Sequence, residues 1–133
     1  MPDNTMTSTE LALKAPVTQA PLQTHVFVCT GSSCSSNESE QTLDRFKEVL
    51  SERGLLYGKA GKKLGTPEGT IIVTKCGSIG LCTIGPAVLI YPQGIWYHHV
   101  SANDVEEIVS SHLIGGQPVE RLLAFKMHAG DSV

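Results

Sequence analysis

The sequence predicts one α/β or α+β domain, with helices packed on a four- or five-stranded mixed sheet in the order β-α-β-β-β-α. Its 133 residues suffice for a single hydrophobic core. Short β-branched, apolar runs alternate with longer amphipathic segments. The apolar content of 41% and charged content of 17% exclude a disordered chain.

The first part of the domain has the pattern strand–helix–strand. Residues 25–29 (HVFVC) and 70–74 (TIIVT) are apolar on both faces, so we expect inner strands of a sheet covered on both sides. A helix begins after Ser35 or Asn37 and runs to about residue 53, where Gly54 ends it. The inner face of this helix is predicted to carry Leu43, Phe46, Val49 and Leu50.

The second part predicts a hairpin followed by a helix. Residues 87–91 (AVLIY) and 95–100 (IWYHHV) are joined by a Pro-Gln-Gly turn. Ser101 caps the last helix, with Asp104 at the capping-box position, and a Gly-Gly pair ends it. The inner face of this helix is predicted to carry Val105, Ile108, Val109 and Leu113.

Composition divides the chain into a domain over residues 23–124, a flexible N-terminal tail over 1–22 and a C-terminal tail over 125–133. The net charge of -3 and the single short basic run at 59–63 argue against nucleic-acid binding. We find neither a membrane-spanning apolar stretch nor a secretory signal, and therefore expect a cytoplasmic, reducing environment.

The four cysteines form two close pairs, and each pair follows a predicted strand. Cys29 and Cys34 lie in VFVCTGSSC, and Cys76 and Cys82 lie in TKCGSIGLC. Four thiolates that converge from two strand-end loops are a ligand set for an iron–sulfur cluster or a structural zinc ion. The first pair has the C-x2-4-C spacing of zinc knuckles and the second does not. Thioredoxin-type oxidoreductase chemistry is excluded because no C-x-x-C motif is present.

The motifs around the cysteines resemble one known family. VFVCTGSSC, G-L-C-x-x-G-P, Y-P-x-G-x-W-Y and H-L-x-G-G-x-P-V-x-R-L occur in this order over roughly residues 24–123. Together they are similar to the thioredoxin-like [2Fe-2S] ferredoxins and to the small cluster-bearing subunit of NADH dehydrogenases and bidirectional hydrogenases. The resemblance implies a thioredoxin-like fold and a [2Fe-2S] cluster.

The resemblance also implies the ligands of this cluster, with one departure from the family pattern. Cys29, Cys34 and Cys82 fall on ligand positions. The family usually spaces the last two ligands C-x-x-x-C, so either Cys76 is the ligand on a longer loop or Ser78 takes its place. Cys76 is favoured, since a thiolate binds iron better than a serine alkoxide and Gly77 allows the loop to reroute.

The function that the resemblance implies is one-electron transfer between redox partners rather than enzymatic turnover, by a soluble ferredoxin that commonly forms a homodimer. The alternatives are a cluster-bearing subunit of an NADH dehydrogenase or hydrogenase complex, and a structural zinc or cluster-sensing module. The short, Pro-containing N-terminal tail favours the independent carrier.

Aromatic and histidine residues outside the cysteine loops have structural interpretations. Trp96 is expected to pack against a sheet face or an interface. His98 and His99 would point to opposite faces of a strand and would therefore not chelate one metal ion. His25 and His112 are expected at an edge or on the surface.

Overall fold

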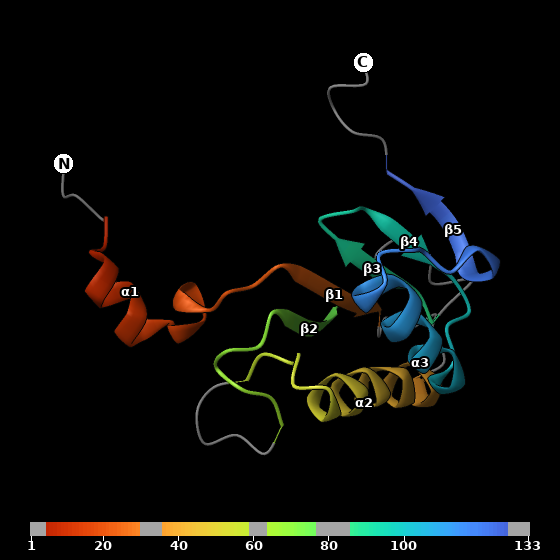
Figure 1. The fold of residues 1–133 in the computed structure, drawn as a ribbon, viewed down its shortest axis with the longest axis horizontal. Helices are drawn as coiled ribbons and strands as arrows, with labels where there is room; N and C mark the ends of the chain where they lie inside the picture. The colour runs from red at the N-terminus through yellow and green to blue at the C-terminus, as the bar shows by residue number, and fades with distance from the viewer. Residues whose placement is uncertain (1–4, 30–35, 59–63, 77–85, 128–133) are drawn as a thin grey trace.

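The computed structural model describes residues 5–29, 36–58, 64–76 and 86–127. Within these residues, five strands form one mixed sheet with the spatial order β2-β1-β3-β4-β5 (Figure 1). β1 pairs in parallel with β2, and all other neighbours are antiparallel. The strands are β1 (Thr24–Cys29), β2 (Ile71–Cys76), β3 (Val88–Tyr91), β4 (Ile95–Tyr97) and β5 (Leu123–Lys126).

Two helical segments form the layer that packs on this sheet. α2 (Ser36–Glu52) crosses over between β1 and β2. The second segment is continuous and changes its winding, from a 3-10 turn, η3 (Ala102–Asp104), through α3 (Val105–Glu107) to a π-helical stretch, η4 (Ile108–Ile114). A further 3-10 turn, η5 (Glu120–Leu122), leads into β5. The predicted order of elements is therefore confirmed, and β5 adds a fifth strand.

The predicted inner faces of both helices line a single hydrophobic core. Phe46 and Leu50 of α2 and Val105 and Ile108 of the second segment are each fully buried. The capping box between Ser101 and Asp104 is present, and Gly54, with a φ of 71°, ends α2 in the left-handed region that glycine tolerates best. Helical periodicity in the sequence therefore identified the packing faces correctly.

The prediction that the inner strands are covered on both sides is wrong for the described residues. Val26 and Val28 of β1 are fully buried in the core, whereas His25 and Phe27, which alternate with them, are only half-buried. The described helices that reach the core pack against the valine side. Among the described residues, the second face of β1 is therefore apolar but only partly covered at His25 and Phe27.

Two strand ends also differ from the sequence prediction. β2 continues two residues beyond the predicted end, to Cys76, so this cysteine lies in the strand rather than in the following loop. β4 ends at Tyr97, three residues before the predicted end. Both differences follow from pairing: β2 extends as far as its partner β1 does, and the partner β3 of β4 begins only at Val88.

The N-terminal segment, predicted as a tail, contains helical turns. α1 (Ser8–Lys14) begins at a capping box between Thr7 and Glu10, and a 3-10 turn, η1 (Pro16–Gln19), follows it. In Figure 1 the two turns extend away from the sheet, and no residue of α1 is buried. The segment joins the domain at Gln23, whose N–H donates to the carbonyl of Thr70.

Candidate metal centre

The candidate centre is built from the ends of two neighbouring parallel strands. Cys29 is the last residue of β1, Cys76 is the last residue of β2, and the two are register partners. Parallel neighbouring strands lie about 4.8 Å apart, and register partners project to the same side of the sheet. The structure thus brings together one cysteine from each predicted pair.

The sheet determines the surroundings of both cysteines. Cys29 is fully buried, and its N–H donates to the carbonyl of Ala87 on the far side of β1. Cys76 is half-buried, and its Sγ lies 3.6 Å from the carbonyl oxygen of Val28, to which it donates. The two side chains are therefore held by the sheet itself, and Cys29 is shielded from water.

The other predicted ligands, Cys34, Cys82 and the alternative Ser78, lie outside the described residues. Within the described ranges, no group of three or more His, Cys, Asp or Glu side chains gathers at one point. The pair Cys29–Cys76 is the part of the predicted ligand set that the structure places. Its soft sulfur donors, set side by side at one sheet end, fit the thiolate ligation that a [2Fe-2S] cluster requires.

The H-L-x-G-G-x-P-V-x-R-L motif has a structural role in the described fold. His112 is buried, with 4% of its surface exposed, so the prediction of an edge or surface position is wrong. Its Nδ1 lies 2.7 Å from the hydroxyl of fully buried Tyr97, and the N–H of Val119 donates to the same hydroxyl at 3.0 Å. The motif thereby fastens the chain after η4 to the centre of the sheet.

The protonation states of this buried pair follow from its burial. Burial lowers the pKa of His112 below its ordinary value. Burial also raises the pKa of Tyr97, although the N–H of Val119 partly offsets this effect. Both shifts favour the neutral forms near pH 7, and the two neutral side chains share one hydrogen bond between the Tyr97 hydroxyl and Nδ1 of His112. A signal for this position was available, because His112 continues the inner stripe of Val105, Ile108 and Val109.

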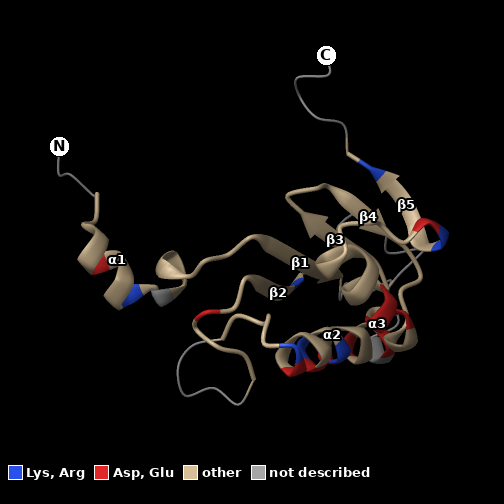
Figure 2. Cartoon of the chain, in the orientation of Figure 1, with Lys and Arg blue, Asp and Glu red and all other residues tan. Residues whose placement is uncertain are grey.

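Arg121 of the same motif forms surface ion pairs with Asp104 and Glu107. Partial burial acts to raise the pKa of Asp104, but hydrogen bonds from Ser101 and Arg121 outweigh it and lower that pKa. These groups join η5 to the start of the second helical segment. Figure 2 shows that many charged residues belong to the helical elements, whereas β1, β3 and β4 carry none.

The aromatic residues of the open sheet face pack on one another. Trp96 stacks on Phe125 with ring centroids 4.8 Å apart, as expected for packing against a sheet face. His25, predicted at an edge or on the surface, is a half-buried residue of the inner strand β1. It stacks on Phe27 at 3.9 Å, and its Nε2 lies 2.7 Å from the Thr74 hydroxyl. Burial lowers the pKa of His25.

The prediction that His98 and His99 point to opposite faces is wrong. β4 ends before them, and His99 has a left-handed φ of 49°, so strand alternation does not apply. Their Nδ1 atoms lie 2.8 Å apart. Sequence periodicity carried no signal for this arrangement, which depends on the point where β4 stops pairing.

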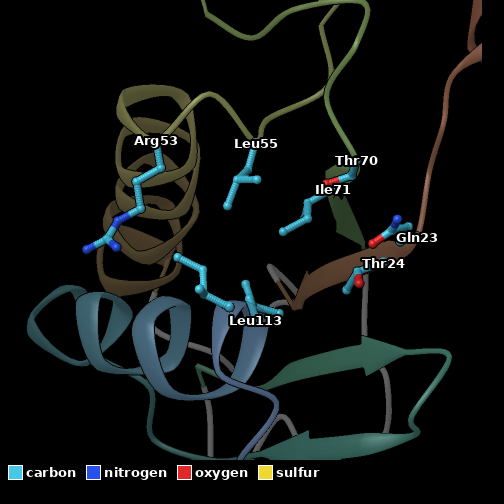
Figure 3. A pocket seen from close by; sticks show the side chains of 8 residues that line it. Gln23, Thr24, Arg53, Leu55, Thr70, Ile71 and Leu113 are labelled. Carbon is cyan, nitrogen blue, oxygen red and sulfur yellow. The ribbon is translucent and has the colours of Figure 1, made fainter.

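An open pocket of about 570 Å³ lies at the opposite end of β1 and β2 from the cysteines (Figure 3). The side chains of Leu55, Ile71 and Leu113 point toward its interior, and that of Arg53 points away. Thr24 at its rim is separated from Cys29 by the length of β1, about 16 Å. The pocket is therefore not part of the candidate centre.

The chain is similar to two [2Fe-2S] ferredoxins over most of its length. It is 37% identical over 106 residues to a 2Fe-2S ferredoxin of Clostridium pasteurianum, covering 74% of this chain and 92% of the relative. It is 36% identical over 110 residues to a 2Fe-2S ferredoxin of Aquifex aeolicus, covering 77% and 89%. No protein-family model matches the chain.

Solved structures give the same result for the fold. A thioredoxin-like [2Fe-2S] ferredoxin from Aquifex aeolicus matches with a TM-score of 0.65 and 32% identity, covering 81% of this chain and 96% of that one. A cysteine-to-serine variant of the Aquifex aeolicus protein matches with a TM-score of 0.64 and 34% identity, covering 78% and 100%. The mixed five-stranded sheet is thus a thioredoxin-like fold, as the sequence motifs implied.

The chain belongs to the thioredoxin-like [2Fe-2S] ferredoxin family. Membership implies a [2Fe-2S] cluster and a role in electron transfer rather than in enzymatic turnover. None of the described helices is long and apolar enough to cross a membrane.

Proposed function

We propose that this protein is a cytoplasmic carrier of single electrons between redox enzymes, with a [2Fe-2S] cluster held by Cys29, Cys34, Cys76 and Cys82. The observation that carries the proposal is the register of Cys29 with Cys76 at the ends of adjacent parallel strands. The bound cluster would supply the one-electron redox chemistry. The chain would hold it through thiolates and restrict the access of water beside buried Cys29.

The position of Cys76 supports this residue as the ligand in preference to Ser78. Cys76 is part of β2 and is held through its Sγ contact to the carbonyl of Val28, beside Cys29. A thiol fixed next to another thiol needs less reorganisation to ligate the same cluster. Thiolate is also the donor that iron–sulfur clusters prefer.

The cluster is tested by purifying the full chain without oxygen and measuring iron, acid-labile sulfide and visible absorption. We expect about two irons and two sulfides per chain, with absorption that bleaches on addition of dithionite. A colourless protein with stoichiometric zinc and no iron would contradict the proposal and favour the structural zinc module.

The ligand assignment is tested by Cys29→Ser and Cys76→Ser, with Ser78→Ala as the matched control. We expect both cysteine variants to lose the cluster or to shift its visible spectrum, and Ser78→Ala to retain the wild-type spectrum. An unchanged spectrum in Cys76→Ser, together with cluster loss in Ser78→Ala, would assign the ligand to Ser78 instead.

An independent carrier is favoured over a subunit of an NADH dehydrogenase or hydrogenase complex. The chain spans 92% and 89% of relatives described simply as 2Fe-2S ferredoxins. Affinity purification from the native cell distinguishes the two cases. A stoichiometric flavin-bearing partner that resists high salt would support the complex subunit and contradict the independent carrier.

A homodimer is the second part of the proposal, with the open sheet face as the surface between two copies. Phe27, Leu89, Trp96 and Phe125 are consecutive register partners across β1, β3, β4 and β5 and form an apolar row. Phe125 has 44% of its surface exposed, and Tyr91, two residues after Leu89 in β3, has 61%. β1, β3 and β4 carry no Lys, Arg, Asp or Glu, so a second uncharged copy of this face suits the surface better than a charged partner does.

The dimer is tested by sedimentation of the wild type, Phe125→Glu and Ile114→Glu. Ile114 is a matched control because it is 53% exposed but lies in η4, which packs on the covered face. We expect a wild-type dimer, a Phe125→Glu monomer and an Ile114→Glu dimer. A monomeric wild type at tens of micromolar would contradict the dimer but not the electron carrier.

A further inference from the structure

His98 and His99 form a pair of converging imidazoles directly after β4. Their Nδ1 atoms are 2.8 Å apart, and their ring planes are inclined at 83° to one another. His99 is exposed and His98 is half-buried, so the pair can be reached from solvent. Consecutive side chains of a strand diverge instead, which makes this convergence a property of the local backbone.

The backbone on both sides of the pair is anchored. The N–H of His98 donates to the carbonyl of Leu122, and the N–H of Val100 donates to the carbonyl of Pro86, each at 2.9 Å. Between these anchors, His99 has a φ of 49°, which is uncommon for a residue other than glycine. Because Leu122 and Val100 are themselves buried in the core, the backbone that carries the two rings is anchored on both sides.

We propose that His98 and His99 form a bidentate site for a divalent transition-metal ion of the copper or nickel type. With metal–imidazole bonds of about 2.0 Å, a right-angle bite separates two ligand nitrogens by about 2.8 Å. This is the Nδ1–Nδ1 distance of the pair. Right-angle bites are those of square-planar and tetragonal ions with nitrogen ligands, whereas tetrahedral zinc needs a wider separation of about 3.3 Å.

Metal binding to two neutral imidazole rings moves one ring proton and releases none. Without metal, one Nδ1–H donates to the other Nδ1, so one lone pair is occupied by a hydrogen bond. A bound ion takes both Nδ1 lone pairs, and the displaced proton moves to Nε2 of the same ring through solvent. No oxidation or reduction is involved.

The site is open rather than enclosed. No third His, Cys, Asp or Glu completes a ligand group around the pair among the described residues. Water would fill the remaining coordination positions. The end of β4 lies at the same end of the sheet as Cys29, because both strands are antiparallel to β3. The site differs from the proposed cluster site in its ligands, since it uses imidazole nitrogens from the segment after β4 instead of cysteine sulfurs.

The proposal is tested by calorimetric titration of Ni²⁺ into the untagged, cluster-containing full chain near pH 7.5. We expect one Ni²⁺ per chain in the wild type. His98→Asn and His99→Asn should each weaken binding by about a hundredfold, because either change converts a chelate into a single-ligand contact. The double variant should bind no more than a few times more weakly than either single variant.

His128→Asn is the matched control, since it removes a histidine outside the described residues. It should leave the Ni²⁺ affinity unchanged, and any contribution of the cysteines is common to all variants. The proposal is overturned if only one of the two single variants loses affinity, if both bind as the wild type does, or if His128→Asn causes the same loss. The electron paramagnetic resonance spectrum of one added Cu²⁺ gives a second readout, with two coupled nitrogens in the wild type and at most one in either single variant.

Discussion

The two faces of the sheet are made from the same strands but differ in how deeply their side chains are buried. On the covered face, Val26, Val28 and Ile90 are fully buried beneath the helices. On the open face, the alternating residues Phe27 and Leu89 are only half-buried. Apolar residues on both faces of a strand therefore do not show which face packs in the core. Here one face forms the core and the other can contact another molecule.

The charge distribution follows the same division. α2 and the second helical segment carry many charged residues (Figure 2), and Arg45 of α2 and Arg53 directly after it both pair with Glu106 of α3. The strands β1, β3 and β4, by contrast, carry no Lys, Arg, Asp or Glu. Four changes test how far the two faces differ, beginning with the largest expected effect.

Ile90→Ala and Leu89→Ala are adjacent changes in β3 that separate the two faces. Removing the fully buried Ile90 side chain should lower the free energy of unfolding by about 2–5 kcal/mol, because it leaves a cavity. Leu89→Ala should lower the free energy of unfolding by well under half of that amount, since the Leu89 side chain is already partly exposed to water. Guanidinium unfolding of both variants measures the difference, and equal losses would show that the open face also carries the fold.

Tyr97→Phe tests the polar link on the covered face. The change removes the hydroxyl that pairs with Nδ1 of His112 and accepts the N–H of Val119. Leaving these buried groups without their partner should cost about 1–3 kcal/mol. Trp96→Phe, the neighbouring aromatic change on the open face, is the control and should cost less. Urea unfolding measures both, and an unaltered midpoint in Tyr97→Phe would contradict the link.

The stability of the fold should depend on pH through the protonation of His112. Burial lowers its pKa in the folded state, so below about pH 6.5 the unfolded chain binds more protons than the folded one. Stability should therefore fall as the pH drops below that value. His25, whose pKa is also lowered by burial, contributes in the same direction.

The measurement is the melting temperature between pH 7.5 and 5.5 for the wild type, His112→Gln and His25→Gln. In each variant the melting temperature should fall less steeply with decreasing pH than in the wild type. The greater burial of His112 predicts the larger change for His112→Gln. A decline as steep in His112→Gln as in the wild type would assign it to other groups.

Arg121→Ala should have the smallest effect of the four. Its ion pairs lie at the surface, with the Arg121 and Glu107 side chains about half exposed and Asp104 partly buried, and surface pairs contribute about 0–1 kcal/mol. Chemical unfolding at low and at high salt measures this contribution, which should shrink as salt screens it. A loss above about 2 kcal/mol would show that the motif arginine has a role beyond these surface pairs.

Much of the fold was predictable because its determinants are local. The stripe of Leu43, Phe46, Val49 and Leu50 identified α2 and its buried side, and Ser101 with Asp104 identified the start of the second segment. The predicted surface position of His112 is wrong although this residue continues such a stripe, because the polar imidazole ring favours a surface position when it is considered alone. The strand limits at Cys76 and Tyr97 were misjudged because strand ends depend on the partner strand.

The sequence by itself determined the order of the elements, the two buried helix faces, the family and the four-cysteine set, because periodicity, capping and motifs are written in neighbouring residues. Only the tertiary structure decided that Cys29 and Cys76 are register partners, that one face of the sheet stays open and that His98 and His99 converge. The physical reason is that strand register, the burial of a sheet face and the ends of strands depend on pairing and packing between segments that are distant in the chain. Local sequence patterns carry no information about these contacts.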